Sequence, residues 1–156
     1  MLVVGLRSEQ GVNIYVRQAQ SLLAPRLDIP DFYHDLAVYQ GRFYLPLPIF
    51  PAVVLVPGVW LLGASNALPI LLAVALTAAS IVVFRAILQH LVIDSDVILW
   101  ATLAFFFGTG YWAAVMWSWG AWFFAHVVAT LCLLLAMREA LIPGRAALSG
   151  LFMGLG

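Results

Sequence analysis

The chain has 156 residues, of which 65% are apolar and only 9% are charged, and its mean hydropathy is +1.05. Soluble domains carry about 25% charged residues, so this composition excludes an ordinary soluble protein. Its arginines and acidic residues balance to a net charge of zero, which argues against a nucleic-acid partner. The single cysteine, Cys132, lies in an apolar run and excludes a disulfide framework. The sequence predicts an integral membrane protein.

The first 46 residues predict the end of one membrane span followed by a loop outside the membrane. The opening MLVVGL is too short to cross and lacks the charged start of a signal peptide. An amphipathic helix of about 15 residues is predicted from an N-cap at Ser8 to Pro25, and we expect it to lie in the headgroup plane. Its apolar face, at helical spacing, consists of Val12, Tyr15, Val16, Ala19, Leu22 and Leu23. Prolines and Gly41 then predict turns and extended backbone up to Pro51.

Four apolar segments follow, and a bilayer is crossed by about 20 apolar residues. A fifth begins near Ala146. The four segments are residues 47–63, 68–90, 97–116 and 119–137. We therefore predict an all-α fold, a polytopic transmembrane helix bundle of four to five spans with an amphipathic juxtamembrane helix. Residues 1–46 form the loop region and residues 47–156 the bundle. Because the chain starts and stops in apolar segments, we expect it to be part of a larger protein.

Gly108-Thr109-Gly110 interrupts the third predicted span. It predicts either a break in which backbone groups line a cavity or a close contact between helices. Four tryptophans gather near the boundary between the third and fourth spans, which favours an interfacial aromatic belt over a sugar-stacking platform. They are Trp112, Trp117, Trp119 and Trp122.

The densest polar cluster lies in the loop. It consists of Asp28, Asp31, His34 and Asp35, followed by Arg42. Carboxylates and an imidazole beside a membrane surface could supply a general base or a metal site, or the acids could simply cap turns in a solvated loop. One histidine with hard oxygen ligands fits no specific metal template, so we predict no metal ligands here.

Two further polar residues stand alone. Glu9 either supports the start of the predicted helix through its dipole or acts chemically. His126 lies within the fourth span, where a polar group either forms an interhelical hydrogen bond or contacts a substrate.

Two blocks of this sequence resemble the bacterial GT-C-type membrane glycosyltransferases related to the protein O-mannosyltransferases and the aminoarabinose lipid A transferases. The first is NIYVRQAQSLLAPRLDIP followed by HDLAVYQGRFYLPLPIFPAVVLVP, which is similar to their first extracytoplasmic loop. The second is FFFGTGYWAAVMWSWGAWFFAHVVATLCLLLAMRE. The proline motif departs from the adjacent prolines common in the family, since it reads Pro46-Leu-Pro48-Ile-Phe-Pro51.

The resemblance implies an enzyme that moves a sugar from a polyprenyl-phosphate donor to a hydroxyl of a lipid, glycan or protein acceptor, with inversion. A loop carboxylate would act as the general base, and both Glu9 and Asp35 match the family's loop acids. Contacts to the lipid phosphate or sugar would come from Asn13, Arg17, His34, Arg42 and His126. No cofactor beyond the lipid-linked sugar is implied, and the need for a divalent metal stays open.

The resemblance also implies that the protein lies in a bacterial plasma membrane, with the loop outside the cytoplasm. If all four segments cross fully, however, every arginine falls on one face, which the positive-inside rule makes cytoplasmic. Either one segment crosses only partly, with a break at Gly108–Gly110, or so few arginines give a misleading bias. Two other classes remain as alternatives: a transporter or flippase fragment, with His126 and Arg85 lining a pathway, and a structural membrane protein without activity.

Overall fold

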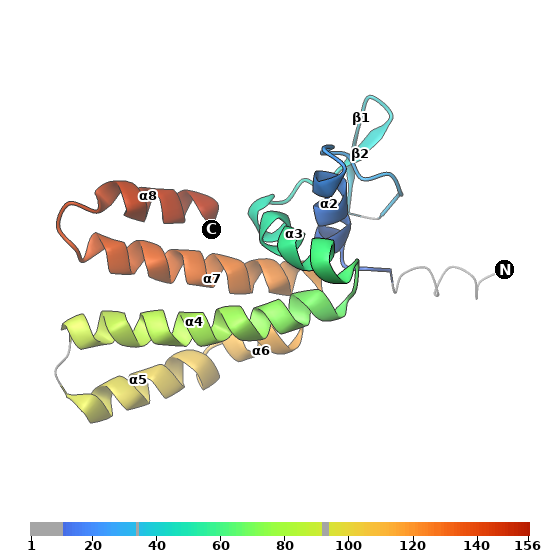
Figure 1. Cartoon of the computed structure of the whole chain (residues 1–156). Helices are drawn as coiled ribbons and strands as arrows, with labels where there is room; N and C mark the ends of the chain where they lie inside the picture. The colour runs from blue at the N-terminus through green and yellow to red at the C-terminus, as the bar shows by residue number, and fades with distance from the viewer. Residues whose placement is uncertain (1–10, 34, 92–93) are drawn as a thin grey trace. The chain divides into compact units, whose positions relative to one another are not determined.

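The computed structural model describes residues 11–33, 35–91 and 94–156. Within these ranges the chain forms seven helices and one two-stranded sheet, so the predicted all-α class holds except for a short hairpin (Figure 1). The chain divides into two compact units, Met1–Leu68 and Pro69–Gly156. The first apolar helix of the described chain therefore belongs with the loop region.

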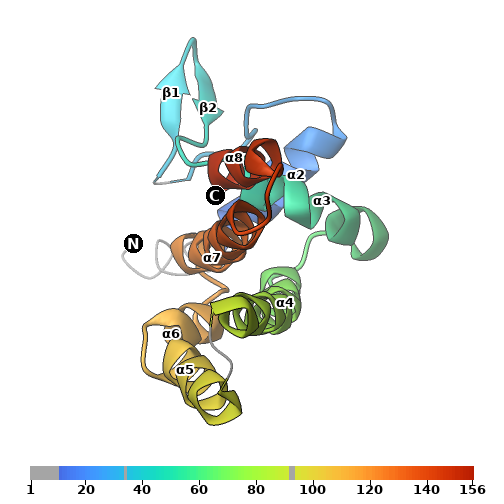
Figure 2. The same cartoon turned by 90° about the vertical axis from the view of Figure 1, so that its left-hand side faces the viewer.

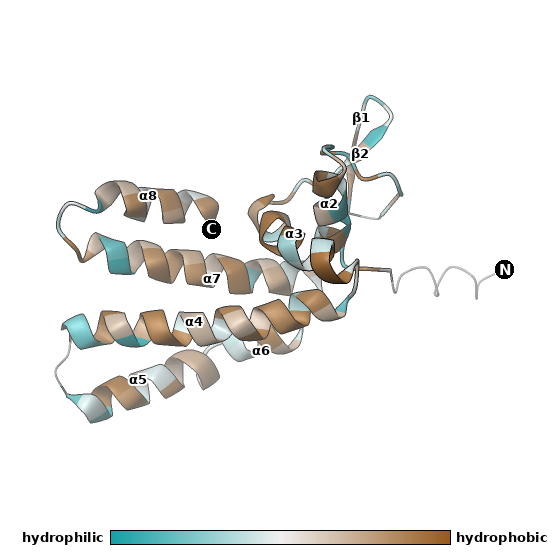
Figure 3. Ribbon diagram, in the orientation of Figure 1, coloured by the Kyte–Doolittle hydropathy of each residue, from teal (hydrophilic) through white to brown (hydrophobic). Residues whose placement is uncertain are grey.

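Two helices of the described chain are long and apolar enough to cross a membrane: α4 (Ala67–Leu91) and α7 (Ala121–Ala140). Their lengths, at 1.5 Å per residue, are about 37 Å and about 30 Å, and a bilayer core is about 30 Å thick. Only 28% and 33% of their most apolar windows are buried inside the protein. Apolar residues cover most of the length of α4 (Figure 3). A core helix of a soluble protein would be mostly buried, so this exposed surface indicates association with a membrane.

Three other apolar helices are shorter: α3 (Phe50–Leu62), α5 (Ser95–Phe107) and α8 (Ala146–Leu155). Helix α3 ends early because Gly63 adopts a positive φ of 76°, a conformation that favours glycine and closes the helix. At 13 residues, α3 and α5 each reach about 20 Å, which is less than the bilayer core. Helix length alone therefore supports two spans in the described residues, fewer than the four to five predicted.

In the first unit, the predicted amphipathic helix is present as α2 (Ile14–Leu23), but it begins later than predicted. Residues 11–13 are not helical, and the side chain of Asn13 caps α2 by accepting a hydrogen bond from the Tyr15 backbone N–H at 2.9 Å. Helix α2 packs against α3 (Figure 1). Tyr15, Val16 and Ala19 are fully buried, so the predicted apolar face is confirmed at its centre and covered by protein.

The segment between α2 and α3 forms a β-hairpin of β1 (Ala37–Tyr39) and β2 (Arg42–Tyr44). Gln40 and Gly41 both have positive φ, at 49° and 74°, as a two-residue hairpin turn of type I′ requires. The backbone N–H of Ile29 donates to the Phe43 carbonyl at 2.8 Å. This bond ties the segment that follows α2 to the hairpin.

In the second unit, four helices lie side by side in the order α8, α7, α4, α5 (Figures 1 and 2). Helix α6 (Tyr111–Met116) continues the chain after α5. The Tyr111 hydroxyl donates to the Ser80 hydroxyl of α4 at 3.0 Å. The ring of Phe105 stacks on Phe84 of α4 at a centroid distance of 4.5 Å and on Tyr111 at 5.1 Å. These contacts connect α5 and α6 to α4.

The predicted interruption at Gly108–Gly110 is confirmed, since α5 ends at Phe107 and α6 begins at Tyr111. The Thr109 hydroxyl donates to the Phe105 carbonyl at 2.6 Å and accepts from the Tyr111 N–H at 3.2 Å. The Thr109 side chain thus supplies a hydrogen-bond partner to the backbone on both sides of the break between α5 and α6. A Cβ at Gly108 would lie 2.7 Å from the Ala104 carbonyl oxygen, so this position requires glycine.

Burial of Tyr15 makes the stability of the first unit depend on pH in the alkaline range. Desolvation raises the pKa of Tyr15 from 10.0 to about 12. The folded state therefore holds the phenolic proton more tightly than the unfolded state, so stability is fully present below about pH 10 and falls as the pH rises toward about 12. We expect the tyrosinate ultraviolet absorbance to show one late-ionising tyrosine, and Tyr15→Phe to lack it. A late phase that persists in Tyr15→Phe would contradict this assignment.

Candidate functional site

The first unit contains a cavity of about 390 Å³ between α2 and the segment that follows it. Helix α2 contributes Arg17, Gln20 and Ser21 to its lining, and the following segment contributes Arg26 and Asp31. The backbone N–H of Arg26 donates to the Ser21 carbonyl at 3.0 Å. This bond folds the chain back against the end of α2, so that two arginines from different elements line one cavity.

Both arginines of this cavity have a hydrogen-bond donor that is not used. The Nε atoms of Arg17 and Arg26 are buried and have no hydrogen-bond partner among the described residues. Buried N–H donors without an acceptor are unfavourable and uncommon in folded proteins. Guanidinium groups are well suited to bind phosphate, and two of them line this cavity. The cavity therefore has the chemistry of an anion site.

The predicted acidic cluster is divided among ion pairs. Asp31 pairs with Arg17 at 3.2 Å, and Asp28 pairs with Arg26 at 3.1 Å. Arg42 lies 4.0 Å from Asp28, and its exposed side chain does not line the cavity. Asp28 and Asp31 thus hold arginines in place, a role that spacing in the sequence did not distinguish from a general base.

Of the other candidate residues in the loop, Asn13 and Asp35 are described. Asn13 is buried, caps α2 and donates its backbone N–H to the Asn66 side chain at 2.7 Å, so its observed contacts are structural. Asp35 is exposed and precedes β1. Glu9 and His34 lie outside the described residues.

His126 is exposed on α7 in the second unit, whereas Arg17 belongs to the first. His126 borders a cavity of about 320 Å³ between α7 and α8, and most of the other residues that line this cavity are apolar. Thr130 and Phe152 also contribute to this lining. The Thr130 hydroxyl donates to the His126 carbonyl at 2.7 Å, which is a bond within the helix.

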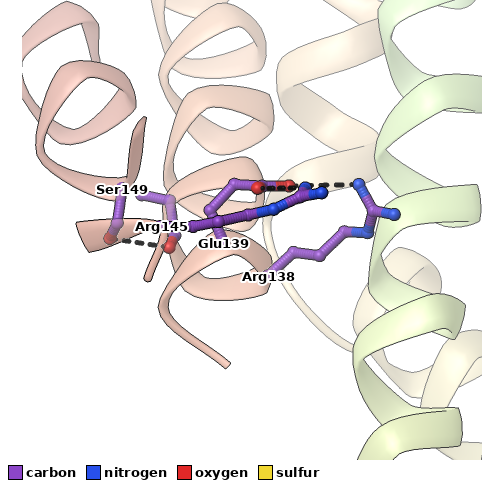
Figure 4. A network of polar contacts seen from close by, with 5 residues as sticks. Arg138, Glu139, Arg145 and Ser149 are labelled. Carbon is purple, nitrogen blue, oxygen red and sulfur yellow. Dashed lines mark hydrogen bonds and ion pairs between the residues drawn. The ribbon is translucent and has the colours of Figure 1, made fainter. Parts of the chain in front are cut away.

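A second polar network, which the sequence did not reveal, joins α7 to α8 (Figure 4). The side chain of Glu139 is only 6% exposed and pairs with Arg138 at 3.2 Å and with Arg145 at 2.8 Å. The Ser149 hydroxyl donates to the Ala136 carbonyl at 2.9 Å. Because the carboxylate is satisfied by both arginines, this network stabilises the turn between the helices.

Arg26 was not predicted from the sequence as a site residue, although it lines the same cavity as Arg17. We call this the anion cavity. Arg26 follows Pro25 directly and lies two residues before Asp28, which reads locally as a solvated ion pair. Its role depends on the chain folding back onto Ser21, which no periodic pattern signals. Among residues 11–33, 35–91 and 94–156, no group of three or more histidine, cysteine or acidic side chains is arranged to hold a metal ion.

No family model, curated protein or solved structure matches the chain.

Proposed function

We propose that the chain is part of a GT-C-type membrane glycosyltransferase that transfers a sugar from a polyprenyl-phosphate donor to a hydroxyl acceptor. The main observation behind the proposal is that two arginines, Arg17 and Arg26, line one cavity and that each has a buried Nε donor without a partner among the described residues. The same unit contains the apolar helix α3, so an anion site and an apolar element occur together. A lipid with a phosphate headgroup has this combination of properties.

In this proposal the arginines bind the phosphate and stabilise the negative charge that develops on it as the lipid leaves. A loop carboxylate removes the proton from the acceptor hydroxyl, whose oxygen attacks the anomeric carbon. The bond between that carbon and the phosphate oxygen breaks, and polyprenyl phosphate departs with the bonding electrons. Glu9 and Asp35 remain the two candidates for the base, because both match the loop acids of the family that the sequence resembles.

We further propose that α3, α5 and α8 also enter the bilayer, which would give the polytopic arrangement expected from the sequence. The break between α5 and α6 supports a partial crossing, because α5 alone is too short to span. If α5 and α6 do not complete a crossing, Arg138 and Arg145 fall on the face opposite the loop, so that the arginines no longer all lie on one face. The extracytoplasmic location of the loop in a bacterial plasma membrane is proposed from the resemblance.

The base is identified by a transfer assay on membranes that contain the protein, with polyprenyl-phosphate sugars as donors. We expect either Glu9→Gln or Asp35→Asn to reduce transfer by about 100-fold or more, because a general base contributes about 10²–10⁴-fold. Asp96→Asn, an exposed acid in the first turn of α5, is the matched control and should transfer normally. Undiminished transfer by the double variant would refute the catalytic assignment of both residues.

A further inference from the structure

A second cavity in the first unit, of about 170 Å³, is lined by one residue of α2, by the last residue of β2 and by residues before and after the hairpin. These residues are Gln18, Leu27, Tyr44, Leu45, Leu47 and Ile49. Leu27 contributes to this cavity, whereas its neighbour Arg26 contributes to the anion cavity. The segment after α2 therefore contributes adjacent residues to two different cavities.

Gln18 is the polar amide of this second cavity and is only 2% exposed. Its Nε2 donates to the Leu27 carbonyl at 3.1 Å, which fixes the orientation of the amide. Its Oε1 is buried and has no hydrogen-bond partner among the described residues. A buried carbonyl oxygen without a donor is unfavourable, so a ligand that supplies an O–H would be favoured here.

The rest of the lining indicates what carries that O–H. Four aliphatic side chains contribute to it, namely Leu27, Leu45, Leu47 and Ile49. Leu47 and Ile49 directly precede the apolar helix α3. The volume is below the range of about 300–1,000 Å³ typical of sites that enclose a whole drug-sized molecule, so the cavity accommodates one end of a ligand.

We propose that this cavity binds the hydroxyl end of an apolar alcohol, with the hydroxyl donating to Gln18 Oε1. The assignment of this alcohol as the sugar acceptor rests on the proposed function and selects a lipid alcohol among the acceptors considered. The binding site itself does not depend on that function.

The test measures binding of cyclohexanol and cyclohexanone to the chain in lipid nanodiscs, followed by the carbon-13 shift of the Gln18 side-chain carbonyl. The two probes share a six-membered ring, but only the alcohol can donate a hydrogen bond. We expect the alcohol to bind about tenfold more tightly than the ketone, because only the alcohol satisfies the buried oxygen. Equal binding of the two probes, as a water-filled cavity would give, overturns the proposal.

Two variants locate the site. Leu47→Trp fills the cavity without altering Gln18 and should abolish binding of both probes, whereas Leu61→Trp on the exposed surface of α3 should leave it unchanged. Gln18→Met should remove the preference for alcohol, read from the shifts of the bound probes. Unchanged binding in Leu47→Trp overturns the proposal even if Gln18→Met fails to fold. Because no sugar or phosphate is present, failure of the glycosyltransferase proposal would leave this result unaffected.

Discussion

Replacing Arg17 and Arg26 together by glutamine is expected to weaken binding of polyprenyl phosphate to the chain in nanodiscs by about a hundredfold. A hydrogen bond to a charged group contributes about 1.5–3 kcal/mol, so each arginine should account for about tenfold or more. Each single variant should show an intermediate loss. The measurement is a titration with polyprenyl phosphate, and the corresponding polyprenyl alcohol, which lacks the phosphate, is the ligand control.

The double variant should remain folded. Arg17 pairs with an Asp31 side chain that is 73% exposed, and such surface pairs contribute little to stability. Asp28, the partner of Arg26, is only 17% exposed but keeps Arg42 as a second partner at 4.0 Å. Arg85→Gln, which removes one exposed arginine of α4, is the matched control for charge and should bind as the wild type does. If Arg85→Gln weakened binding as much as Arg17→Gln, the effect would be one of general charge and the cavity would not be the site.

Replacing Glu139 by alanine is expected to loosen the contact between α7 and α8. The substitution removes two charge-assisted hydrogen bonds and leaves Arg138 and Arg145 without their shared carboxylate. Because both arginines are about half exposed and can be solvated by water, we expect the free energy that holds α8 against α7 to fall by about 1–2 kcal/mol. Hydrogen exchange of the α8 backbone amides should then be about five- to thirtyfold faster.

Two single substitutions with the same charge change provide the control for this network. Arg145 is the N-cap residue of α8 and bridges to α7, whereas Arg138 is the immediate neighbour of Glu139 on α7. Arg145→Gln should therefore accelerate exchange in α8 more than Arg138→Gln does. Equal exchange in wild type and Glu139→Ala would show that Ser149 and apolar contacts alone hold the two helices together.

The long helices were well predicted from the sequence. The predicted segments 68–90 and 119–137 match α4 and α7 within about three residues, because long apolar runs leave little choice of structure. The segment 47–63 was predicted too long. Prolines restrict its start and the positive φ of Gly63 closes its end, and hydropathy does not register either effect.

The buried face of α2 was predicted only in part. Apolar periodicity correctly selected Tyr15, Val16 and Ala19, but the structure also buries Gln18 and Ser21. A buried glutamine is stable here because a carbonyl from a later segment accepts its N–H. Such a partner comes from tertiary folding, and a count of apolar positions along one helix does not include it.

In the candidate site, too, some residues were predicted from the sequence, and others depend on how the loop folds. Arg17 was predicted as a phosphate contact from the resemblance; it lines the same cavity as Arg26, and its contact with phosphate stays a prediction. Arg26 was missed because its position depends on a backbone bond to Ser21. The acidic cluster was visible in the sequence, but its pairing with arginines depends on how the loop folds.

In the proposed function, the cavity lined by Arg17 and Arg26 binds the phosphate of a polyprenyl lipid. The most direct measurement is photocrosslinking in nanodiscs with a polyprenyl phosphate that carries a diazirine in its first isoprene unit, followed by peptide mapping. We expect crosslinks to α2 and to the segment that contains Arg26 and Asp31, and we expect them to be lost in the double variant Arg17→Gln, Arg26→Gln. Crosslinks confined to the α7–α8 cavity beside His126, unchanged in that variant, would contradict the proposed function and favour a transport pathway.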